Sequence, residues 1–231
     1  MVFQLDASQF LSALPPHPDE GWQHRIPHGN RVGRGFSLDR GKLDCLTGCL
    51  RAIRGVTGAM LAQPTDLNPI WQLSNELLGS QVASLPELEK AYGRNQCTML
   101  AVKRTTVDRC DSSMGEMTGV LAVLFLSCAG KAAVLDGCFS PREINPSWLV
   151  DTRSLPVAGY VWAMAANNTN ARRRIVLLGR RLSLTFSQID QFARPVTPAG
   201  GRLVRLLGFT PRKVRYGQSA NGSLWLRPAT P

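Results

Sequence analysis

The stretch Tyr160-Val-Trp-Ala-Met-Ala-Ala166 is followed by Asn167-Asn-Thr-Asn-Ala-Arg-Arg-Arg174 and then by Ile175-Val-Leu-Leu178. The first part is apolar, as a buried strand is, and the last begins a helical pattern. The first N–H groups of a helix lack intrahelical partners and carry partial positive charge, so a strand leading into such a helix start is a natural anion site. Three guanidinium groups add full charges and forked donors that suit phosphate. The stretch therefore predicts a phosphate-bearing ligand at the end of a central strand.

The net charge is concentrated in the last third of the chain. The 231 residues are enough for one sizeable domain with an appendage, and they carry a net charge of +11. Residues 1–150 hold 14 basic and 14 acidic side chains, whereas 151–231 hold 13 basic ones against Asp151 and Asp190. This imbalance indicates an anionic partner, namely a phosphate cofactor, nucleic acid, an acidic protein or a membrane surface. A solvated basic face without a specific partner is the alternative.

Cysteine and histidine usage argues against a metal site and for a cytoplasmic protein. The six cysteines are scattered without a C-x-x-C pair, and the three histidines lie near the N-terminus. A zinc site needs tighter clustering, so buried reduced thiols and no metal are expected. The longest apolar run, Gly119–Ala129, is too short to span a bilayer as a helix. The N-terminus lacks the pattern of a secretory signal.

The first half of the chain predicts helices. Apolar residues recur at helical spacing in three segments: 1–13, 42–62 and 67–92, the last as one or two helices. If 67–92 forms two helices, Ser84 and Glu87 fit a capping box at the start of the second one. The Pro- and Gly-rich segment 15–41 predicts an irregular arm.

The second half predicts strands with two helices among them. The expected strands are 98–103, 120–126 with a hairpin partner at 132–135, 156–166, 189–196, and a final hairpin of 213–216 and 223–226. The expected helices are 171–186 and 198–207, and the polar segments 105–117 and 141–154 predict loops. Helices followed by strands and two later helices predict a mixed α/β domain.

This order resembles that of the GNAT acyltransferase superfamily, which runs strand, two helices, antiparallel strands, then strand–helix–strand–helix–strand. The resemblance covers roughly 35–227 and is most specific over 158–209. It implies an α/β fold of the mixed α+β kind, with a central, mostly antiparallel sheet flanked by helices. It also implies a single GNAT-like acyltransferase domain at 35–231, and the residue pattern before that domain predicts an N-terminal helix and irregular arm at 1–34.

The resemblance implies an acyl-CoA site over the quoted stretch. Tyr160–Ala166 resembles the family's fourth strand, whose splayed end receives the pantetheine arm, and Asn167–Arg174 resembles its pyrophosphate loop. The implied cofactor-binding residues are Met164, Ala165, Ala166, Asn170, Ala171, Arg172, Arg173 and Arg174. The family loop has the pattern Gln/Arg-x-x-Gly-x-Gly/Ala, but here Arg173 and Ile175 stand at the small positions. Arginine side chains are then an alternative to backbone N–H groups for holding phosphate.

Few groups are available for proton transfer. Transfer to an amine needs a base within reach of the amine proton, and Asp136, Glu143 and Asp151 are candidates, with Tyr160 and Tyr216 as possible acids. Family members often carry a proton-donating tyrosine four residues before the glycine of the motif that here is Leu206-Leu-Gly-Phe209. That position is Val204, so the family's general acid is absent from its usual place.

Three functions remain open at this point. The resemblance implies an acyl-CoA-dependent N-acyltransferase, most simply acetyl transfer by direct attack of an amine on the thioester. The altered loop and Val204 favour instead a catalytically inactive GNAT-like module that binds CoA or another anionic ligand. The basic C-terminal part favours a nucleic-acid-binding protein, although it carries no helix-turn-helix, zinc-finger or RNA-recognition signature.

Overall fold

The computed structural model describes residues 50, 59–79, 82–104, 115–212 and 223–230, all of which fall within the unit Asp44–Pro231. The predicted helix at 1–13, the predicted arm at 15–41 and the expected strand at 213–216 lie outside the described residues. The division of the chain near residue 34 therefore stays a prediction.

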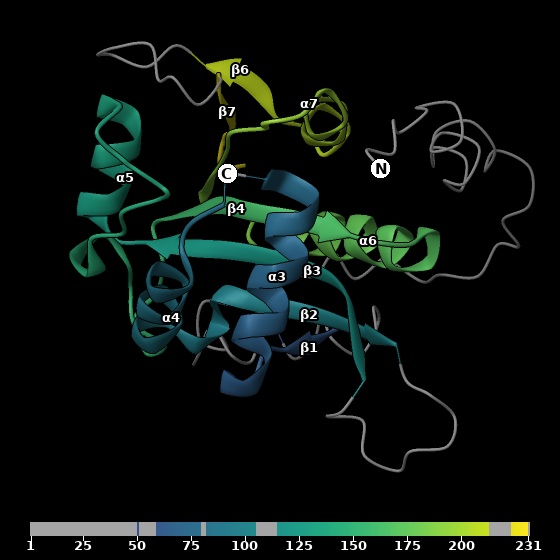
Figure 1. Cartoon of the computed structure of the whole chain (residues 1–231). Coiled ribbons are helices and arrows are strands. Elements are labelled where there is room, and N and C mark those ends of the chain that lie inside the picture. The colour runs from purple at the N-terminus through teal and green to yellow at the C-terminus, as the bar shows by residue number, and fades with distance from the viewer. Residues whose placement is uncertain (1–49, 51–58, 80–81, 105–114, 213–222, 231) are drawn as a thin grey trace, which may run out of the picture. The chain divides into compact units, whose positions relative to one another are not determined.

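A seven-stranded sheet in the order β1-β2-β3-β4-β5-β7-β6 forms the centre of the described part (Figure 1). The strands are β1 (Met60–Leu61), β2 (Met99–Arg104), β3 (Glu116–Leu126), β4 (Ala158–Ala166), β5 (Asp190–Ala193), β6 (Thr210–Arg212) and β7 (Leu224–Arg227). Neighbouring strands are antiparallel except β4 and β5, which are parallel. A parallel pair needs a crossover connection, and helix α6 supplies it.

Helices flank the sheet in the part of the chain from 59 onward that the structure describes. They are α3 (Leu67–Leu78), α4 (Leu85–Arg94), α5 (Cys128–Asp136), α6 (Thr169–Thr185) and α7 (Pro198–Leu206), with short 3-10 turns η1 (Pro64–Asp66), η3 (Gln96–Thr98) and η5 (Pro146–Trp148). The described residues thus show strand, two helices, antiparallel strands and then strand–helix–strand–helix–strand. The predicted mixed fold class and its GNAT-like order are confirmed, with α5 as an addition between β3 and β4.

Strand β3 is buried on both faces, as its continuous apolar run predicts. Val120 and Ala122 face the core that α3 and α4 complete. On the other face Phe125 meets Phe186, which follows α6, with ring centroids 5.2 Å apart. Helices α3 and α6 therefore cover opposite faces of the sheet, as Figure 1 shows.

The predicted strand at 132–135 is wrong, because these residues belong to helix α5. The Ser127 side chain accepts the N–H of Gly130 and starts the helix, and Gly137 ends it in the left-handed conformation at φ 80°. Neither signal depends on the apolar pattern, which is too short to separate a strand from a helix turn. Strand β3 pairs with β4 instead of a local hairpin partner.

Further boundaries differ from the expected ones, and strand β5 ends at Ala193 instead of at 196. The expected helix at 42–62 does not reach its end, because Met60 and Leu61 form β1 on the edge of β2. Strand β3 begins at Glu116, inside the expected loop, since Glu116 and Met117 pair with β2. Helix α6 begins at Thr169, two residues before the expected start.

Two ion pairs tie the elements together. The Lys103 ammonium in β2 lies 2.7 Å from the Asp66 carboxylate in η1, and both side chains are buried. Lys131 in α5 lies 2.8 Å from Asp190 in β5. Burial acts to raise the pKa of Asp190, but Lys131 and the N–H of Ala229 outweigh it and lower that pKa below its ordinary value.

Candidate functional site

The parallel pair β4 and β5 parts after Val161. The paired residues run from Ala158 opposite Asp190 to Val161 opposite Ala193, and β5 ends there. Pro195 follows shortly and has no N–H to continue a ladder. Strand β4 continues to Ala166 and stays paired with β3 over this length. Its other edge no longer pairs with β5 beyond Val161.

A register shift marks the place where the strands part. Val123 pairs with Val161 and Ala122 with Ala163, so Trp162 is an extra residue in β4 and forms a bulge. The Trp162 indole N–H donates to the Pro141 carbonyl at 2.9 Å, which anchors the bulge to the loop before η5. A bulge bends the strand that carries it, and this accounts for the departure of β4 from β5.

The open edge of β4 presents the backbone groups of Met164 and Ala166. The N–H of Asn167 donates to Thr118 in β3 at 3.0 Å. The N–H groups of successive residues alternate between the two edges of a strand. The N–H of Ala165 therefore also faces β3, whereas the N–H groups of Met164 and Ala166 face away from it. Of the predicted residues, these two bring polar backbone groups to the open edge. Ala165 contributes a side chain that is 5% exposed, in the core beneath α3 and α4.

Strand β4 leads directly into the N-terminus of α6. Only Asn167 and Asn168 separate the two elements, so Asn170 to Arg174 are helical and do not form an irregular loop. The Asn168 side chain accepts the N–H of Ala171 at 2.8 Å, and its carbonyl accepts the N–H of Arg172 at 2.9 Å. The N–H groups of Thr169 and Asn170 remain without an intrahelical acceptor, as in the first turn of any helix.

The three arginines lie on different sides of α6. Arg172 shares a stripe with Val176 and Gly179, at four and seven residues further on. A Cβ at Gly179 would lie 3.0 Å from the Met164 methyl group and 3.5 Å from Leu207, so this stripe faces β4 and the end of α7. Arg173 is exposed, and Arg174 lies about 200° around the helix from Arg172. Of the three arginines, Arg172 is therefore the one on the side of α6 that faces β4, near the place where β4 and β5 separate.

The helix start packs closely on β3. A Cβ at Gly119 would lie 3.1 Å from Ile175, so glycine in β3 leaves room for this isoleucine. Ile175, which stands at a small position of the family pattern, is therefore a core residue one turn beyond the first N–H groups. The residues that carry those N–H groups, Thr169 and Asn170, are exposed and polar.

The candidate acid–base residues border one segment beside β4. Phe139 contacts Tyr160 with ring centroids 4.9 Å apart, and Pro141 binds Trp162, so the segment from Asp136 to Glu143 follows β4 up to the bulge. Asp136 ends α5 and is half-buried, and Glu143 is exposed.

Tyr160 itself lies in the core. Its side chain is 2% exposed, and burial raises its pKa to about 12 in spite of the opposing charge of Arg194. A phenol with this pKa keeps its proton at neutral pH. Packing against Phe139 and Phe192 is the role that its surroundings support directly.

Val204 also belongs to the core. It packs in a small cluster with Ala193, Phe209 and Trp225, and Val161 borders that cluster. The position of the family tyrosine is therefore next to the place where β4 and β5 part, but here it offers only aliphatic carbon.

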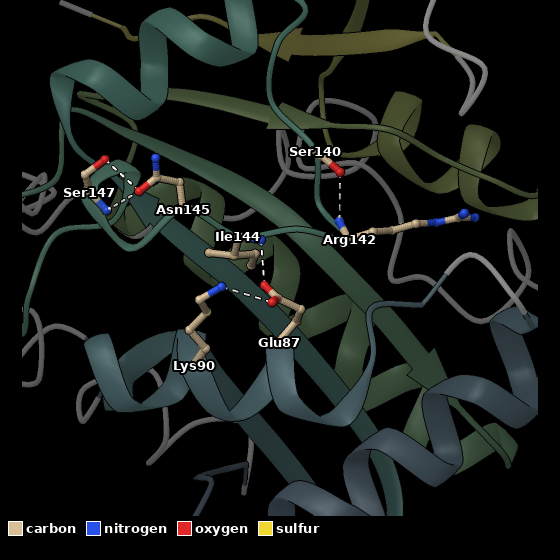
Figure 2. Close-up of polar contacts among 7 residues, drawn as sticks. All are labelled: Glu87, Lys90, Ser140, Arg142, Ile144, Asn145 and Ser147. Carbon is tan, nitrogen blue, oxygen red and sulfur yellow. Dashed lines mark hydrogen bonds and ion pairs between the residues drawn. The ribbon is translucent and has the colours of Figure 1, made fainter.

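Glu87 holds the loop before η5, a role that sequence reasoning missed. Figure 2 shows its carboxylate between Lys90 on its own helix, at 3.0 Å, and the backbone N–H of Ile144, at 2.6 Å. Partial burial acts to raise the pKa of Glu87, but these two donors outweigh it and lower that pKa. The predicted capping box with Ser84 is wrong, because the Ser84 side chain makes no cap bond in α4.

The same loop makes its own turn contacts. Asn145 accepts from both the N–H and the hydroxyl of Ser147, at 3.0 and 2.8 Å, and thereby starts η5 (Figure 2). The N–H of Arg142 donates to Ser140 at 3.4 Å. Local turn chemistry of this kind is readable from Asn-Pro-Ser in the sequence, whereas the tether to Glu87 spans 57 positions and is not.

Asn168 is the other residue that sequence reasoning missed. Its signal was present, because asparagine is among the preferred N-cap residues and two asparagines end the apolar run. The expected helix start at 171 puts Asn168 in a loop, whereas the structure makes it the N-cap of α6.

The described residues contain no cluster of three or more His, Cys, Asp and Glu side chains suited to a metal ion. Among the same residues, no helix is long and apolar enough to cross a membrane.

Comparison with known proteins gives similarity at the level of structure. The sequence matches no family model and no curated protein. An N-acetyltransferase from Staphylococcus aureus Mu50 is 11% identical, and the match covers 73% of this chain and 99% of that one with a TM-score of 0.45. A protein described as histone acetyltransferase HPA2 and related acetyltransferase, from Corynebacterium glutamicum ATCC 13032, is 12% identical, with 74% and 96% covered and a TM-score of 0.45. Such identities concern the fold alone, and the element order and the single parallel pair β4–β5 make the described fold GNAT-like.

Proposed function

We propose that this protein transfers an acyl group from acyl-CoA, most simply acetyl-CoA, to the amine of an acceptor molecule. One observation carries the proposal. The edge of β4 that β5 leaves open runs without an intervening loop into the N-terminus of α6. The open edge of β4 suits extended amide groups, and the N-terminus of α6 suits a pyrophosphate. CoA contains both groups in the same order.

The residues present fit such a ligand. The backbone groups of Met164 and Ala166 would pair with the amides of the pantetheine arm, as a neighbouring strand does. The N–H groups of Thr169 and Asn170 would bind the pyrophosphate, with Arg172 beside them. Acyl-CoA supplies the thioester acyl group, and the open-edge N–H groups of β4 are suited to polarise its carbonyl.

Proton transfer would fall to groups near the Trp162 bulge. Asp136 and Glu143 flank the segment beside β4 and would take the amine proton directly or through water. Tyr160 would take part only if its core position opens, since it is 2% exposed. Val204 has no proton to give, so the leaving thiolate would take one from water or from the acceptor.

The buried Val204 also favours a second candidate, a module that binds CoA or another anionic ligand without catalysis. Both candidates share the α6 anion site and differ in turnover. A nucleic-acid contact is a third outcome, which salt dependence identifies, because a contact with several phosphates loses about three to five decades of affinity between 50 and 200 mM salt.

The first experiment measures CoA and acetyl-CoA binding by calorimetry for the wild type, Arg172→Ala and Arg180→Ala. Arg180 is the matched control, since it is an exposed arginine on the same helix, about two turns beyond Arg172 and about 80° around the helix from it. We expect Arg172→Ala to weaken binding about tenfold, in the range of a charge-assisted hydrogen bond, and Arg180→Ala to change it less than about twofold.

Free thiol release with a panel of amines then separates the two candidates. Binding without thiol release on any amine supports the non-catalytic module. No binding up to millimolar ligand, or equal losses in both variants, contradicts the α6 site.

A further inference from the structure

The side of α6 that faces away from the sheet exposes leucines as well as arginines. Leu177 is 39% exposed and Leu184 is 54% exposed, and Arg180 and Arg181 lie between them and are exposed. These four residues are called the outer α6 face below. The apolar residues on the sheet side of the helix, Ile175, Leu178 and Leu182, are all buried. The two exposed leucines are therefore not part of that packing.

The spacing of the outer α6 face forms a short seam. Leu177 and Leu184 are seven residues apart and lie about 10 Å from each other along the helix. At about 100° per residue, Arg180 and Arg181 fall on opposite sides of the line that joins the two leucines. The result is an apolar line with a guanidinium group on each flank.

No acidic side chain among the described residues pairs with the arginines of the outer α6 face. Helix α6 contains no Asp or Glu, so no i,i+4 pair neutralises its arginines. The ion pairs between described residues involve Glu87, Asp66 and Asp190, and none of them includes Arg180 or Arg181. An exposed leucine pair flanked by unpaired cations therefore fits a partner that is apolar in the middle and acidic at the sides.

Other occupants match this face less well. A second copy would bring Arg180 and Arg181 against the same residues across a two-fold axis, which like charges oppose. Nucleic acid offers phosphates to the arginines but nothing to the leucines, and the exposed part of α6 has no aromatic ring on which bases stack. A membrane surface favours a broader apolar face with aromatic side chains.

We propose that the outer α6 face binds an acidic amphipathic helix of a protein partner. In this arrangement an apolar row of the partner helix packs between Leu177 and Leu184, and its Asp or Glu residues pair with Arg180 and Arg181. The proposal does not depend on acyl transfer, because the outer α6 face uses neither the β4 edge nor Arg172.

The test uses a fluorescein-labelled synthetic helix of about 18 residues, long enough to be helical, with leucines at i, i+3 and i+7 and glutamates on both flanks. Anisotropy gives its affinity for the full-length wild type, Leu177→Ser/Leu184→Ser and Arg180→Glu/Arg181→Glu. Leu155→Ser and Arg153→Glu are the matched controls, since both residues are exposed on the connection before β4. Thermal unfolding of each variant shows that the fold is retained.

We expect each double variant to weaken binding at least about tenfold and the two controls to change it less than about twofold. A second peptide with lysines in place of glutamates should bind Arg180→Glu/Arg181→Glu better than the wild type, a result that a merely sticky surface does not produce. The proposal is overturned if the leucine variant binds as the wild type does, if no binding occurs at about 100 µM, or if anionic vesicles or duplex DNA bind more tightly with the same sensitivity to the variants.

Discussion

Asn168→Asp tests the anion site at the start of α6 with effects of opposite sign on folding and on binding. The Asn168 side chain accepts the N–H of Ala171 at 2.8 Å. Aspartate caps a helix about as well as asparagine does, and its charge beside the helix N-terminus stabilises by about 0.3–1 kcal/mol. Without ligand, the variant should therefore unfold at the same temperature as the wild type or slightly above it.

CoA binding should weaken in the same variant. A phosphate on the first N–H groups of α6 would lie on the order of 5 Å from the new carboxylate, within one helical turn. Two unit charges at that distance repel by about 1 kcal/mol in water and by about 3 kcal/mol at an effective dielectric constant of 20. Because about 1.4 kcal/mol corresponds to a factor of ten in affinity, the affinity should fall by a factor between about 5 and about 140.

The assay is calorimetric titration of CoA into the wild type, Asn168→Asp and Asn168→Ser at two salt concentrations. Serine is the control, since it caps the helix without adding charge. The loss in the aspartate variant should shrink at higher salt. Unchanged CoA affinity in a folded Asn168→Asp protein would refute an anion at this helix start, and reduced stability without ligand would refute the cap itself.

Three further predictions concern stability. The pKa of Asp190 is lowered in the folded state, so its contribution to the free energy of unfolding is complete above its ordinary pKa and is lost as the pH falls through the folded pKa. Asp190→Asn should therefore make the free energy of unfolding less dependent on pH in the acid range, as measured by urea titrations at several pH values. Asp66→Asn removes the carboxylate from beside the buried Lys103 ammonium and should cost about 1.5–3 kcal/mol by urea unfolding, the range of a hydrogen bond to a charged group, whereas Asp66→Leu with Lys103→Met removes both charges and should cost less. Glu87→Ala removes the acceptor of the Ile144 N–H, and hydrogen exchange at that amide should speed up while exchange in the sheet core does not change.

Long apolar runs made much of the fold predictable. The pattern of 120–126 predicted a strand buried on both faces, and β3 is one because helices cover it from both sides. Residues 158–166, 169–185 and 198–206 also form the expected strand and helices to within a few positions. These segments are long enough for their period to distinguish strand from helix.

Short segments were decided by their neighbours. Ala132–Leu135 has the same residue types as a strand, but the Ser127 cap and the left-handed Gly137 make it helical. Met60 and Leu61 continue a helical spacing, yet they pair with the free edge of β2. Four residues or fewer contain too little periodicity to resist a tertiary contact.

The anion site was predictable in kind and not in detail. Sequence alone determined that an apolar strand meets a cationic helix start, because composition and order suffice for that conclusion. Tertiary structure decided which groups take part. The Trp162 bulge separates β4 from β5, strand alternation turns Met164 and Ala166 to the open edge, and packing of Gly179 on Met164 places the Arg172 stripe beside them. Each of these depends on register between segments far apart in the chain, and register is set by pairing and packing partners that the local pattern does not contain.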